Sequence, residues 1–379
     1  MDVFLIMMPF MNLFFLFLLS QVSSPDISSF EYERAEKGYQ QPELYGEPVL
    51  YEGEVFFSDL RQLTFGGQNA EAYWSPDGTK LVFQSRRDGA NVDSIYLFDL
   101  ADLSVEKLSS GKGVTTCAWW LSDSRRIIFA STHEEMPGDP PPPDYSKGYV
   151  WPVHSSYEIY LMDTETKQLE KLTDSDGYDA EGEGVMWDKK NTMIFTSSRD
   201  GDLDLYSMEI DGDRSVKRLT YEPGYDGGSI PGYSGEYIVW RRTSANTEEE
   251  IRDFKDLLAD DLVRPSQLDI WIMRADGTHR MQITNNGAAN FGPSIAPNDN
   301  FIFYVSNVDD PQGRDFDIYM HQLSGFKPKT QKVTFFEGFD GFPIFSPNGK
   351  WVVFASNRNG LVEGETNLFI AEWIGPSAN

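Results

Sequence analysis

The stretch that decides the fold is Tyr73-Trp74-Ser75-Pro76-Asp77-Gly78-Thr79-Lys80-Leu81-Val82-Phe83-Gln84-Ser85-Arg86-Arg87-Asp88-Gly89. It is followed by the run Ile95-Tyr96-Leu97-Phe98-Asp99 and by Lys107-Leu108-Ser109. A near copy of this unit returns at Phe345-Ser346-Pro347-Asn348-Gly349-Lys350-Trp351-Val352-Val353-Phe354-Ala355-Ser356-Asn357-Arg358-Asn359-Gly360, with Leu368-Phe369-Ile370 after it. A unit that recurs at this scale indicates a repeat architecture.

Four less regular copies of the unit lie between the two clear ones. Each combines a short apolar run, a polar turn and a second apolar run, in the same order as the clear copies. Their first runs begin at Trp120, Trp187, Tyr233 and Ile295. On this alignment the position of Phe83 recurs at Phe129, Phe195, Val239, Phe303 and Phe354.

Each copy of the unit predicts four short strands. The apolar runs are bounded by turns such as Pro76-Asp77-Gly78 and Arg87-Asp88-Gly89, whose residues tolerate tight chain reversals. A four-stranded unit of roughly 40–45 residues is typical of one blade of a β-propeller. Blades pack face to face and bury both sheet faces, which accounts for runs that are apolar almost throughout. The sequence therefore predicts an all-β fold, a six-bladed β-propeller of four-stranded blades.

The first strand of the propeller is expected to belong to the last blade. The sixth copy has no fourth strand after Trp373, whereas a segment of the fourth-strand type, Leu60-Arg61-Gln62-Leu63-Thr64, precedes the first copy. We expect this N-terminal strand to complete blade six, because closing the ring removes the exposed edges that an open sheet has. The propeller domain is accordingly assigned to residues 55–374.

The N-terminus carries an apolar segment that indicates export. Val3–Leu19 is apolar apart from one proline and one asparagine, and Ser20-Gln21-Val22-Ser23-Ser24 follows it. The run is short for a membrane span, so residues 1–24 are interpreted as a signal peptide and residues 25–54 as a polar linker. Because no Lys or Arg precedes the run, an uncleaved anchor stays open as the alternative. We expect a secreted or periplasmic protein with no membrane span once the signal is removed.

The chain is strongly acidic, with 60 Asp and Glu residues against 32 Lys and Arg and a formal net charge of −28. Binding a phosphate backbone needs a basic footprint, so this composition argues against nucleic acid as a partner. An acidic surface favours solubility and a monomer, and it attracts cations or basic partners. The single cysteine, Cys117, rules out an intrachain disulfide.

The repeated unit resembles that of a known family. Ser75-Pro76-Asp77-Gly78, Ser85-Arg86-Arg87-Asp88-Gly89, Ile95-Tyr96 and Leu63-Thr64 are similar to the WD-like repeats of TolB-type six-bladed propellers. The resemblance extends over nearly the whole chain after the signal segment, and it implies the fold. TolB itself also carries an N-terminal α/β domain that contacts its membrane partners, and the short segment before Val55 is not expected to supply one. Because one fold hosts many functions, the working residues must be sought in the loops.

Two long insertions indicate one working face. Both lie between the second and third strands of a blade, the first in blade two and the second in blade four, so both fall on the same side of the ring. The blade-two insertion, residues 133–154, contains four consecutive prolines, Pro140–Pro143, which form a stiff polyproline stretch. Its aromatic residues are expected to cap the channel mouth or grip a ligand, or simply to pack on the ring.

The candidate ligand-binding residues come from this insertion and from the segments that enter the first strands. They are His133, Glu135, Tyr145, Tyr149, Trp151 and His154 from the insertion, and Glu71, Asp179 and Glu181 from the channel. The ligand is expected to be a protein or a glycan. Cys117 also belongs to the channel segments, and it is either a nucleophile or, as small buried cysteines commonly are, a structural residue.

The blade-four insertion predicts a helix over residues 247–262. Thr247 and Glu250 form a capping box, and Pro265 is expected to stop the helix. The apolar residues of the segment share one helix face. That face either packs on the propeller rim or binds a partner or a second copy of the chain.

No cofactor is evident in the sequence, and the acidic residues offer calcium or another divalent cation as the candidate. Asp200, Asp202 and Asp204 have calcium-like spacing, although Arg-Asp-Gly is also the turn of the repeat itself. A polar residue before each third strand, such as Asp269 or Asp317, contributes to a partial acidic ring. These side chains either cap the turn backbone or bind such a cation.

Two functions are consistent with these features. The first is a non-catalytic binding and interaction module that uses the insertion-bearing face. The second is a lyase or hydrolase at the channel mouth that uses His133, His154 and Glu181 with a divalent metal. Convergence of the histidines and two carboxylates within coordinating distance would favour the enzyme. The sequence favours the binding module, leaves catalysis undecided, and contains no Gly-x-Ser-x-Gly nucleophile motif.

Overall fold

The structure is a computed structural model that describes residues 49–187, 190–265, 267–323 and 328–376. All of these residues belong to one of the two compact units of the chain, Gln41–Asn379. The interpretation of residues 1–24 as a signal peptide lies outside the described residues, as does most of the segment interpreted as a linker.

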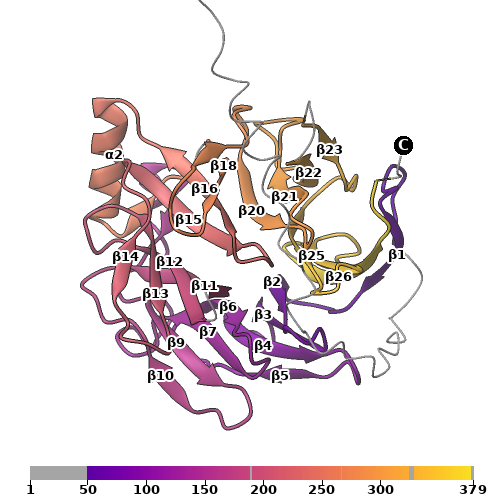
Figure 1. Cartoon of the computed structure of the whole chain (residues 1–379), viewed down its shortest axis with the longest axis horizontal. Coiled ribbons are helices and arrows are strands. Elements are labelled where there is room, and N and C mark those ends of the chain that lie inside the picture. The colour runs from indigo at the N-terminus through magenta and orange to yellow at the C-terminus, as the bar shows by residue number, and fades with distance from the viewer. Residues whose placement is uncertain (1–48, 188–189, 266, 324–327, 377–379) are drawn as a thin grey trace, which may run out of the picture. The chain divides into compact units, whose positions relative to one another are not determined.

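Six four-stranded antiparallel sheets follow one another around a central channel (Figure 1). Blade one comprises β2 (Gln68–Trp74), β3 (Lys80–Arg86), β4 (Ser94–Asp99) and β5 (Val105–Lys107). Blade two comprises β6 (Thr115–Trp120), β7 (Arg126–Ser131), β9 (Glu158–Asp163) and β10 (Leu169–Lys171). Blade three comprises β11 (Asp179–Trp187), β12 (Lys190–Ser197), β13 (Asp204–Glu209) and β14 (Val216–Arg218).

The second half of the ring repeats the pattern. Blade four comprises β15 (Gly224–Pro231), β16 (Tyr237–Ser244), β18 (Asp269–Arg274) and β19 (Met281–Gln282). Blade five comprises β20 (Asn290–Ile295), β21 (Phe301–Ser306), β22 (Asp317–Gln322) and β23 (Thr330–Lys332). Blade six comprises β24 (Asp340–Phe345), β25 (Trp351–Ser356), β26 (Asn367–Trp373) and β1 (Phe57–Gln62). The predicted six-bladed propeller is therefore confirmed.

The N-terminal strand closes the ring as the sequence predicts. β1 pairs antiparallel with β26, and Leu60 lies opposite Ala371 while Gln62 lies opposite Phe369. Leu63 extends the pairing, because its N–H donates to the carbonyl of Leu368 at 2.8 Å. The last blade is thus built from both ends of the described chain, and β26 has no free edge.

A buried arginine holds the segment before β1 in place. Arg358 follows β25, and its guanidinium donates to the Glu54 carboxylate at 2.8 and 3.1 Å and to Asp340 at 2.7 Å. The side chains of all three residues are fully buried. Arg358 also donates to the carbonyl of Val49 at 3.1 Å. Residues 49–54, which the sequence assigns to a linker, therefore pack directly against blade six.

The aromatic core of each blade is a cross-strand pair between the second and third strands. Phe83 lies opposite Tyr96 in blade one, and the same register in the other blades pairs an aromatic residue with an aromatic residue. The equivalents of Phe83 are Phe129, Phe195, Trp240, Tyr304 and Phe354. The sequence alignment was thus wrong by one residue in blades four and five, where it placed Val239 and Phe303. Those runs are apolar on both faces, so their pattern alone does not fix the register.

A side-chain hydrogen bond explains the recurring Leu-Thr pair of the fourth strands. In blade three, Thr220 donates to Asp204 at 3.0 Å, and the N–H of Leu205 donates to Thr220 at 2.9 Å. In blade two, Thr173 bonds Glu158 and the N–H of Ile159 in the same way. In five blades the polar residue at the start of the third strand therefore joins the outer strand to its neighbour, close to the capping role that the sequence suggests.

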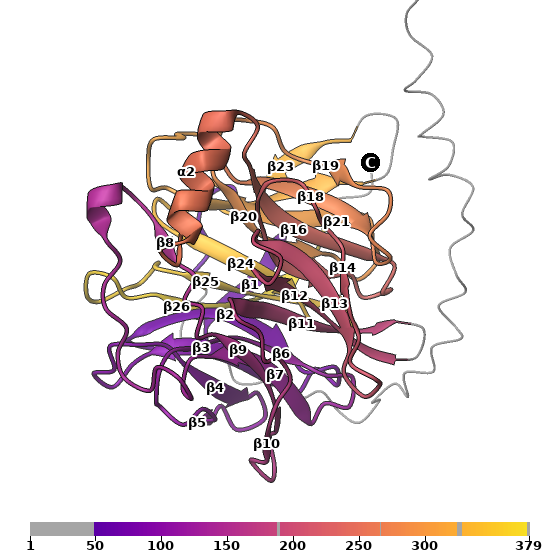
Figure 2. The same cartoon turned by 90° about the vertical axis from the view of Figure 1, so that its left-hand side faces the viewer.

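The two insertions meet each other on one side of the ring. Strand β8 (Trp151–Pro152) of the blade-two insertion pairs antiparallel with β17 (Leu262–Val263) of the blade-four insertion. Helix α2 (Glu248–Leu258) and the short 3-10 helix η2 (Tyr145–Lys147) accompany this sheet, and Figure 2 shows α2 and β8 on the same side of the ring. Residues 144–154 and 247–264 are called the cap below.

The helix prediction is confirmed, except at its end. Thr247 accepts from the N–H of Glu250 at 3.2 Å, and Glu250 accepts in return from the N–H of Thr247 at 2.9 Å, which completes the capping box. Phe254 and Leu257 are the buried residues of the helix. It ends at Leu258, before Pro265, because the chain turns into β17. In the part of the chain that the structure describes, no helix has the length and apolar character needed to span a membrane.

Removing the Glu54 carboxylate should weaken ring closure. We expect Glu54→Ala to lower the free energy of unfolding by about 3 kcal/mol or more, because it leaves part of a buried guanidinium without partners. Urea unfolding of the purified protein measures the change. Glu363→Ala, an exposed glutamate in the same blade, is the matched control and should change stability by less than about 0.5 kcal/mol. Equal stability of the two variants would contradict the role given to Glu54.

Candidate functional site

The inner strand of every blade contains a β-bulge at the same place. The register shifts between Ala70 and Tyr73 in β2, and at the corresponding points in β6, β11, β15, β20 and β24. One residue of each bulge has left-handed backbone with φ between 51° and 55°, namely Glu71, Cys117, Glu181, Gly228, Gly292 and Phe342. A bulge re-aims a side chain, and these six residues line the central channel.

The bulge residues divide the channel into two unlike halves. Blades one to three contribute two glutamates and a cysteine, whereas blades four to six contribute two glycines and a phenylalanine. The glycines make room for large neighbours. A Cβ on Gly228 would lie 2.1 Å from Nη1 of Arg241, and one on Gly292 would lie 3.0 Å from the ring of Phe342.

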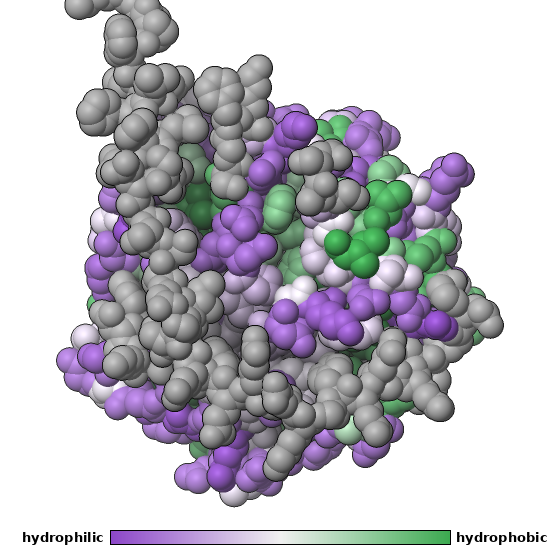
Figure 3. All heavy atoms as spheres, turned by 45° about the vertical axis from the view of Figure 1, so that its right-hand side comes forward, coloured by the Kyte–Doolittle hydropathy of each residue, from purple (hydrophilic) through white to green (hydrophobic). Residues whose placement is uncertain are grey.

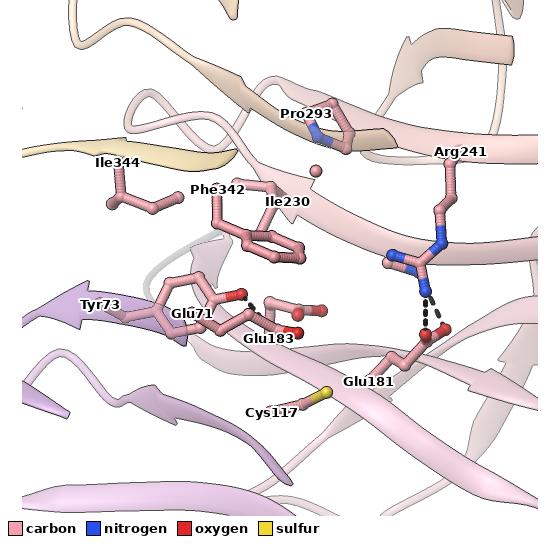
Figure 4. A pocket seen from close by; sticks show the side chains of 12 residues that line it. Glu71, Tyr73, Cys117, Glu181, Glu183, Ile230, Arg241, Pro293, Phe342 and Ile344 are labelled. Atoms are coloured by element: carbon pink, nitrogen blue, oxygen red, sulfur yellow. Dashed lines mark hydrogen bonds and ion pairs between the residues drawn. The ribbon is translucent and has the colours of Figure 1, made fainter. Parts of the chain in front are cut away.

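A small cavity lies where the bulges converge (Figure 4). Its volume is about 30 Å³, which is room for one or two water molecules. The polar lining comes from Glu71, Tyr73, Cys117, Glu181, Glu183 and Arg241. Ile230, Pro293, Phe342 and Ile344 supply the apolar lining. The site is therefore a small, acidic chamber on the axis of the propeller.

Arg241 organises the acidic half of the chamber. Its guanidinium forms an ion pair with Glu181 and donates to the hydroxyl of Tyr225. The Tyr225 hydroxyl in turn donates to Glu181 at 2.7 Å. Glu181 also accepts from the N–H of Gly228 at 2.9 Å and from Thr196 at 2.8 Å. This carboxylate is fully satisfied, so its role is to fix Arg241.

Two further glutamates share the chamber with less support. Glu71 accepts a hydrogen bond from Tyr73 at 3.3 Å, and Glu183 accepts one from Ser229 at 3.5 Å. Burial is the main cause that raises the pKa of Glu71 to about 7, with the Glu181 charge adding to it and Arg241 opposing it. Burial, with the charges of Glu181 and Glu71, also raises the pKa of Glu183 well above its ordinary value. Carboxyl groups of this kind hold a proton near neutral pH.

The chamber does not activate its cysteine. Burial, followed by the charges of Glu71 and Glu181, raises the pKa of the Cys117 thiol well above its ordinary value. A thiolate is the reactive form, so these surroundings oppose a nucleophilic role. Of the two interpretations that the sequence left open for Cys117, the structure supports the structural one.

The cap reaches the chamber through one aromatic residue. Trp151 of β8 lies over the guanidinium of Arg241, 5.6 Å from ring centroid to Cζ, while Tyr225 stacks at 5.4 Å. The indole N–H of Trp151 donates to the hydroxyl of Tyr149 at 3.0 Å. Two aromatic rings and a carboxylate thus surround the cation that faces the channel.

Comparisons with known proteins agree with the fold. No known protein-family profile matches the chain. A "Protein TolB homolog" of Chlamydia muridarum is 24% identical over 188 residues, which cover 47% of this chain and 38% of the relative. A "Tol-Pal system protein TolB" of Helicobacter pylori is 23% identical over 158 residues, which cover 42% of this chain and 32% of the relative. The matched region thus spans about a third of the length of these curated relatives.

A solved structure gives the same answer at the level of the fold. TolB from Acinetobacter baumannii superposes with a TM-score of 0.51 and 20% identity, over 70% of this chain and 54% of that one. The chain is a TolB-like six-bladed β-propeller. The β1–β26 closure and the repeated bulges show how this TolB-like sequence builds it.

The structure brings together some of the predicted site residues. Glu71 and Glu181 line the chamber, and Trp151 contacts Arg241 above it. Tyr145 and Tyr149 lie on the cap, and their side chains are 64% and 65% exposed. The prediction that insertion aromatics reach the channel mouth holds for Trp151.

Other predicted residues lie elsewhere and have structural partners. Asp179 is fully buried at the start of β11, where it accepts from Arg199 at 2.9 and 3.0 Å. His133 packs on the Tyr160 ring at a centroid distance of 4.5 Å. It occupies the repeat position at which Arg199 stacks on the aromatic pair of blade three. Glu135 is exposed, and His154 lines a separate groove of the cap.

The calcium-like aspartates all have protein partners, and Arg218 pairs with both Asp200 and Asp204. Asp200 accepts from the Tyr206 hydroxyl at 2.8 Å, and Asp202 accepts from the N–H of Leu203 at 2.9 Å. Asp204 pairs with Arg218 at 2.5 Å. Within the described ranges, no three His, Cys, Asp or Glu side chains lie close enough to share a metal ion. The structure gives the calcium hypothesis no support at this position.

Arg241 is the site residue that the sequence analysis missed. In five blades a serine at or next to the end of the second strand faces the first residue of the third strand: Ser85, Ser131, Ser197, Ser306 and Ser356. Blade four has Arg242 at that position, directly after Arg241. Two adjacent arginines in an otherwise apolar strand were the available signal. Tyr225 gave no such signal, because aromatic residues are common at every blade.

Glu71 should make stability depend on pH. Its folded pKa of about 7 lies above the ordinary value of 4.5, so the folded protein holds a proton that the unfolded chain releases. Stability from this group is complete below about pH 4.5 and is lost as pH rises to about 7. We expect Glu71→Gln to reduce that loss by up to about 3 kcal/mol. Urea unfolding at several pH values measures the difference.

The exposed Glu52 supplies the control for this titration. Glu52→Gln removes the same charge outside the chamber, so its pH profile should follow that of the wild type. A Glu71→Gln profile parallel to the wild type between pH 4.5 and 7 would show that Glu71 ionises normally.

Proposed function

We propose that this TolB-like propeller is an exported interaction module, periplasmic or secreted, that binds a protein partner through the face carrying the cap. The observation that carries the proposal is the union of two separate insertions into one ordered sheet, β8–β17, above the channel. A rigid scaffold that presents ordered loops on one face is the usual arrangement of a binding protein.

The exposed residues of that face support the proposal. Large apolar side chains are exposed in second-to-third-strand loops and in the links between blades: Phe65 (60%), Tyr145 (64%), Tyr149 (65%), Tyr221 (58%), Leu361 (90%) and Val362 (68%). Tyrosine and phenylalanine are enriched in protein–protein interfaces. Figure 3 views the molecule from another side, where the described apolar side chains lie in small groups between polar ones.

The relatives and the N-terminal segment support the location and the kind of partner. Two relatives are named TolB homolog and Tol-Pal system protein TolB. The match spans about a third of the length of these relatives, so a shared role in protein interaction is part of this proposal. The apolar segment Val3–Leu19 is interpreted as an export signal, which fits a periplasmic or secreted protein.

The alternative of a lyase or hydrolase has one observation in its favour. Glu71 and Glu183 are carboxyl groups with raised pKa on the channel axis, and such groups cluster at catalytic sites. The enclosed space of about 30 Å³ holds only one or two water molecules, so a sugar ring or a peptide would have to bind at its open side. The sequence predicts that an enzyme would bring His133, His154 and two carboxylates within coordinating distance of one another. His133 stacks inside blade two and His154 lines the cap groove, so this observation favours binding.

Site-specific photo-crosslinking tests which face binds. A photoreactive phenylalanine analogue replaces Tyr145 or Leu361 on the cap face, or Asn348 in an exposed first-to-second-strand turn of the opposite face. The variants are expressed in the organism that naturally makes the protein. We expect Tyr145 and Leu361 to cross-link to the same protein, and Asn348 to give no such product.

Two results would count against the proposal. Cross-linking from Asn348 alone would place the binding surface on the opposite face. Turnover of an oligosaccharide or peptide by the purified protein, abolished by Glu71→Gln or Glu183→Gln, would establish the enzyme instead. Thermal melts of each variant confirm that the propeller remains folded.

A further inference from the structure

The cap contains a groove that is separate from the channel chamber. Its volume is about 530 Å³, and it runs between the polyproline stretch of the blade-two insertion and the end of the blade-four insertion. Pro141–Pro143, Asp144 and Lys147 form one wall, while Asp260 and Asp261 contribute to the other. The size falls within the range of ligand sites.

The groove is held open by bonds between the two insertions. The N–H of Val153 donates to the carbonyl of Asp261 at 2.8 Å, and the N–H and hydroxyl of Ser155 donate to its carboxylate at 3.1 Å. Arg264 donates to the carbonyl of Lys147 at 2.9 Å, and Lys147 pairs with Asp260. A ligand therefore meets walls that are already in position, which lowers the entropic cost of binding.

The chemistry of the walls favours a cationic ligand that donates hydrogen bonds. Asp144, Asp260 and Asp261 face a single cation, Lys147. A polyproline wall has carbonyl acceptors and flat ring faces but no N–H donors. Both features suit a chain that carries Lys or Arg side chains and offers its own backbone N–H groups.

One buried atom in the groove has no protein partner. His154 lines the groove, and among the described residues its Nε2 is buried without a hydrogen-bond partner. Burial lowers the pKa of His154, so the imidazole is neutral and adds no positive charge. A buried polar atom normally has a partner, and a bound ligand or water would supply one here.

We infer that this groove binds an extended basic segment of the protein partner, with Lys or Arg side chains against Asp144 and Asp260. The inference rests on the proposed function and adds the chemistry of the partner. The overall charge of −28 supports it, because an acidic protein steers basic partners toward itself. The exposed Tyr145 follows Asp144 directly in the chain and offers a ring face to the same segment.

Peptide binding to the exported protein tests the inference. The probe is a fluorescein-labelled ten-residue peptide in which Lys or Arg alternates with Val or Ser, and fluorescence anisotropy measures its affinity. We expect saturable binding that weakens with salt. The double variant Asp144→Asn/Asp260→Asn should weaken it at least about tenfold, because each charged hydrogen bond is lost. An equivalent peptide with Glu in place of Lys and Arg should not bind.

The control removes the same charge from the opposite face. Asp102 and Asp213 are exposed turn residues that accept from the N–H of Ser104 and of Ser215, as Asp144 does from Ser146. We therefore expect Asp102→Asn/Asp213→Asn to bind the basic peptide with an affinity within about twofold of the wild type. A loss of affinity equal to that of the groove variant would indicate attraction by the overall charge instead. Asparagine caps the turns at Asp102, Asp144 and Asp213 as well as aspartate does, and Asp260 is exposed, so both variants should fold.

The outcomes separate this inference from the proposed function. If the wild type does not bind the basic peptide while Tyr145 still cross-links to a partner, the groove inference is wrong and the proposed function stands. If cross-links appear only on the opposite face, the proposed function fails, whatever the peptide result. Binding of a neutral oligosaccharide that is lost in Tyr145→Ala, without peptide binding, would replace the basic segment by a glycan.

Discussion

Pairing between β1 and β26 is the constraint on which the rest of the structure depends. It joins residues that are very far apart in the chain, as shown by Ser58, which donates to Glu372 across 314 positions. The buried Arg358 adds Glu54 and Asp340 to this junction. The inner strands converge on one axis only in a closed ring, so the chamber, its bulges and the position of the cap all follow from it.

The sequence predicts the fold well because each copy of the repeat contains the turn and strand signals of its own blade. Turns such as Pro76-Asp77-Gly78 and runs such as Trp351–Ser356 carry their own strand signal, and the capping box at Thr247 marks the start of α2. The register in blades four and five was predicted wrongly. A strand that is buried on both faces is apolar throughout, so its hydrophobic pattern is unchanged by a shift of one residue. Contacts with the third strand decide it, as Trp240 opposite Trp271 shows.

The candidate site could be predicted only where it follows the repeat. Glu71 and Glu181 belong to the segments that enter the inner strands, so their place near the axis was foreseen. Arg241 was missed because its importance comes from neighbours on other blades and on the cap. The pairing of β8 with β17 could not be predicted from the sequence either. Each of these strands has only two residues, and one residue of β8 is a proline, so neither shows the alternation of polar and apolar residues that marks a strand.

The bulge residues also bear on how such a ring can diverge after duplication of its repeat. At the rim, the loops between strands have room to lengthen, as those of blades two and four have done, and the two insertions pair with each other through β8 and β17. On the axis all six copies share one small volume, and a Cβ on Gly292 of blade five would lie 3.0 Å from the ring of Phe342 of blade six. Gain of bulk in one copy therefore demands loss of bulk beside it. Loop length at the rim can therefore change in one blade at a time, whereas the side-chain volumes of residues on the axis have to change together.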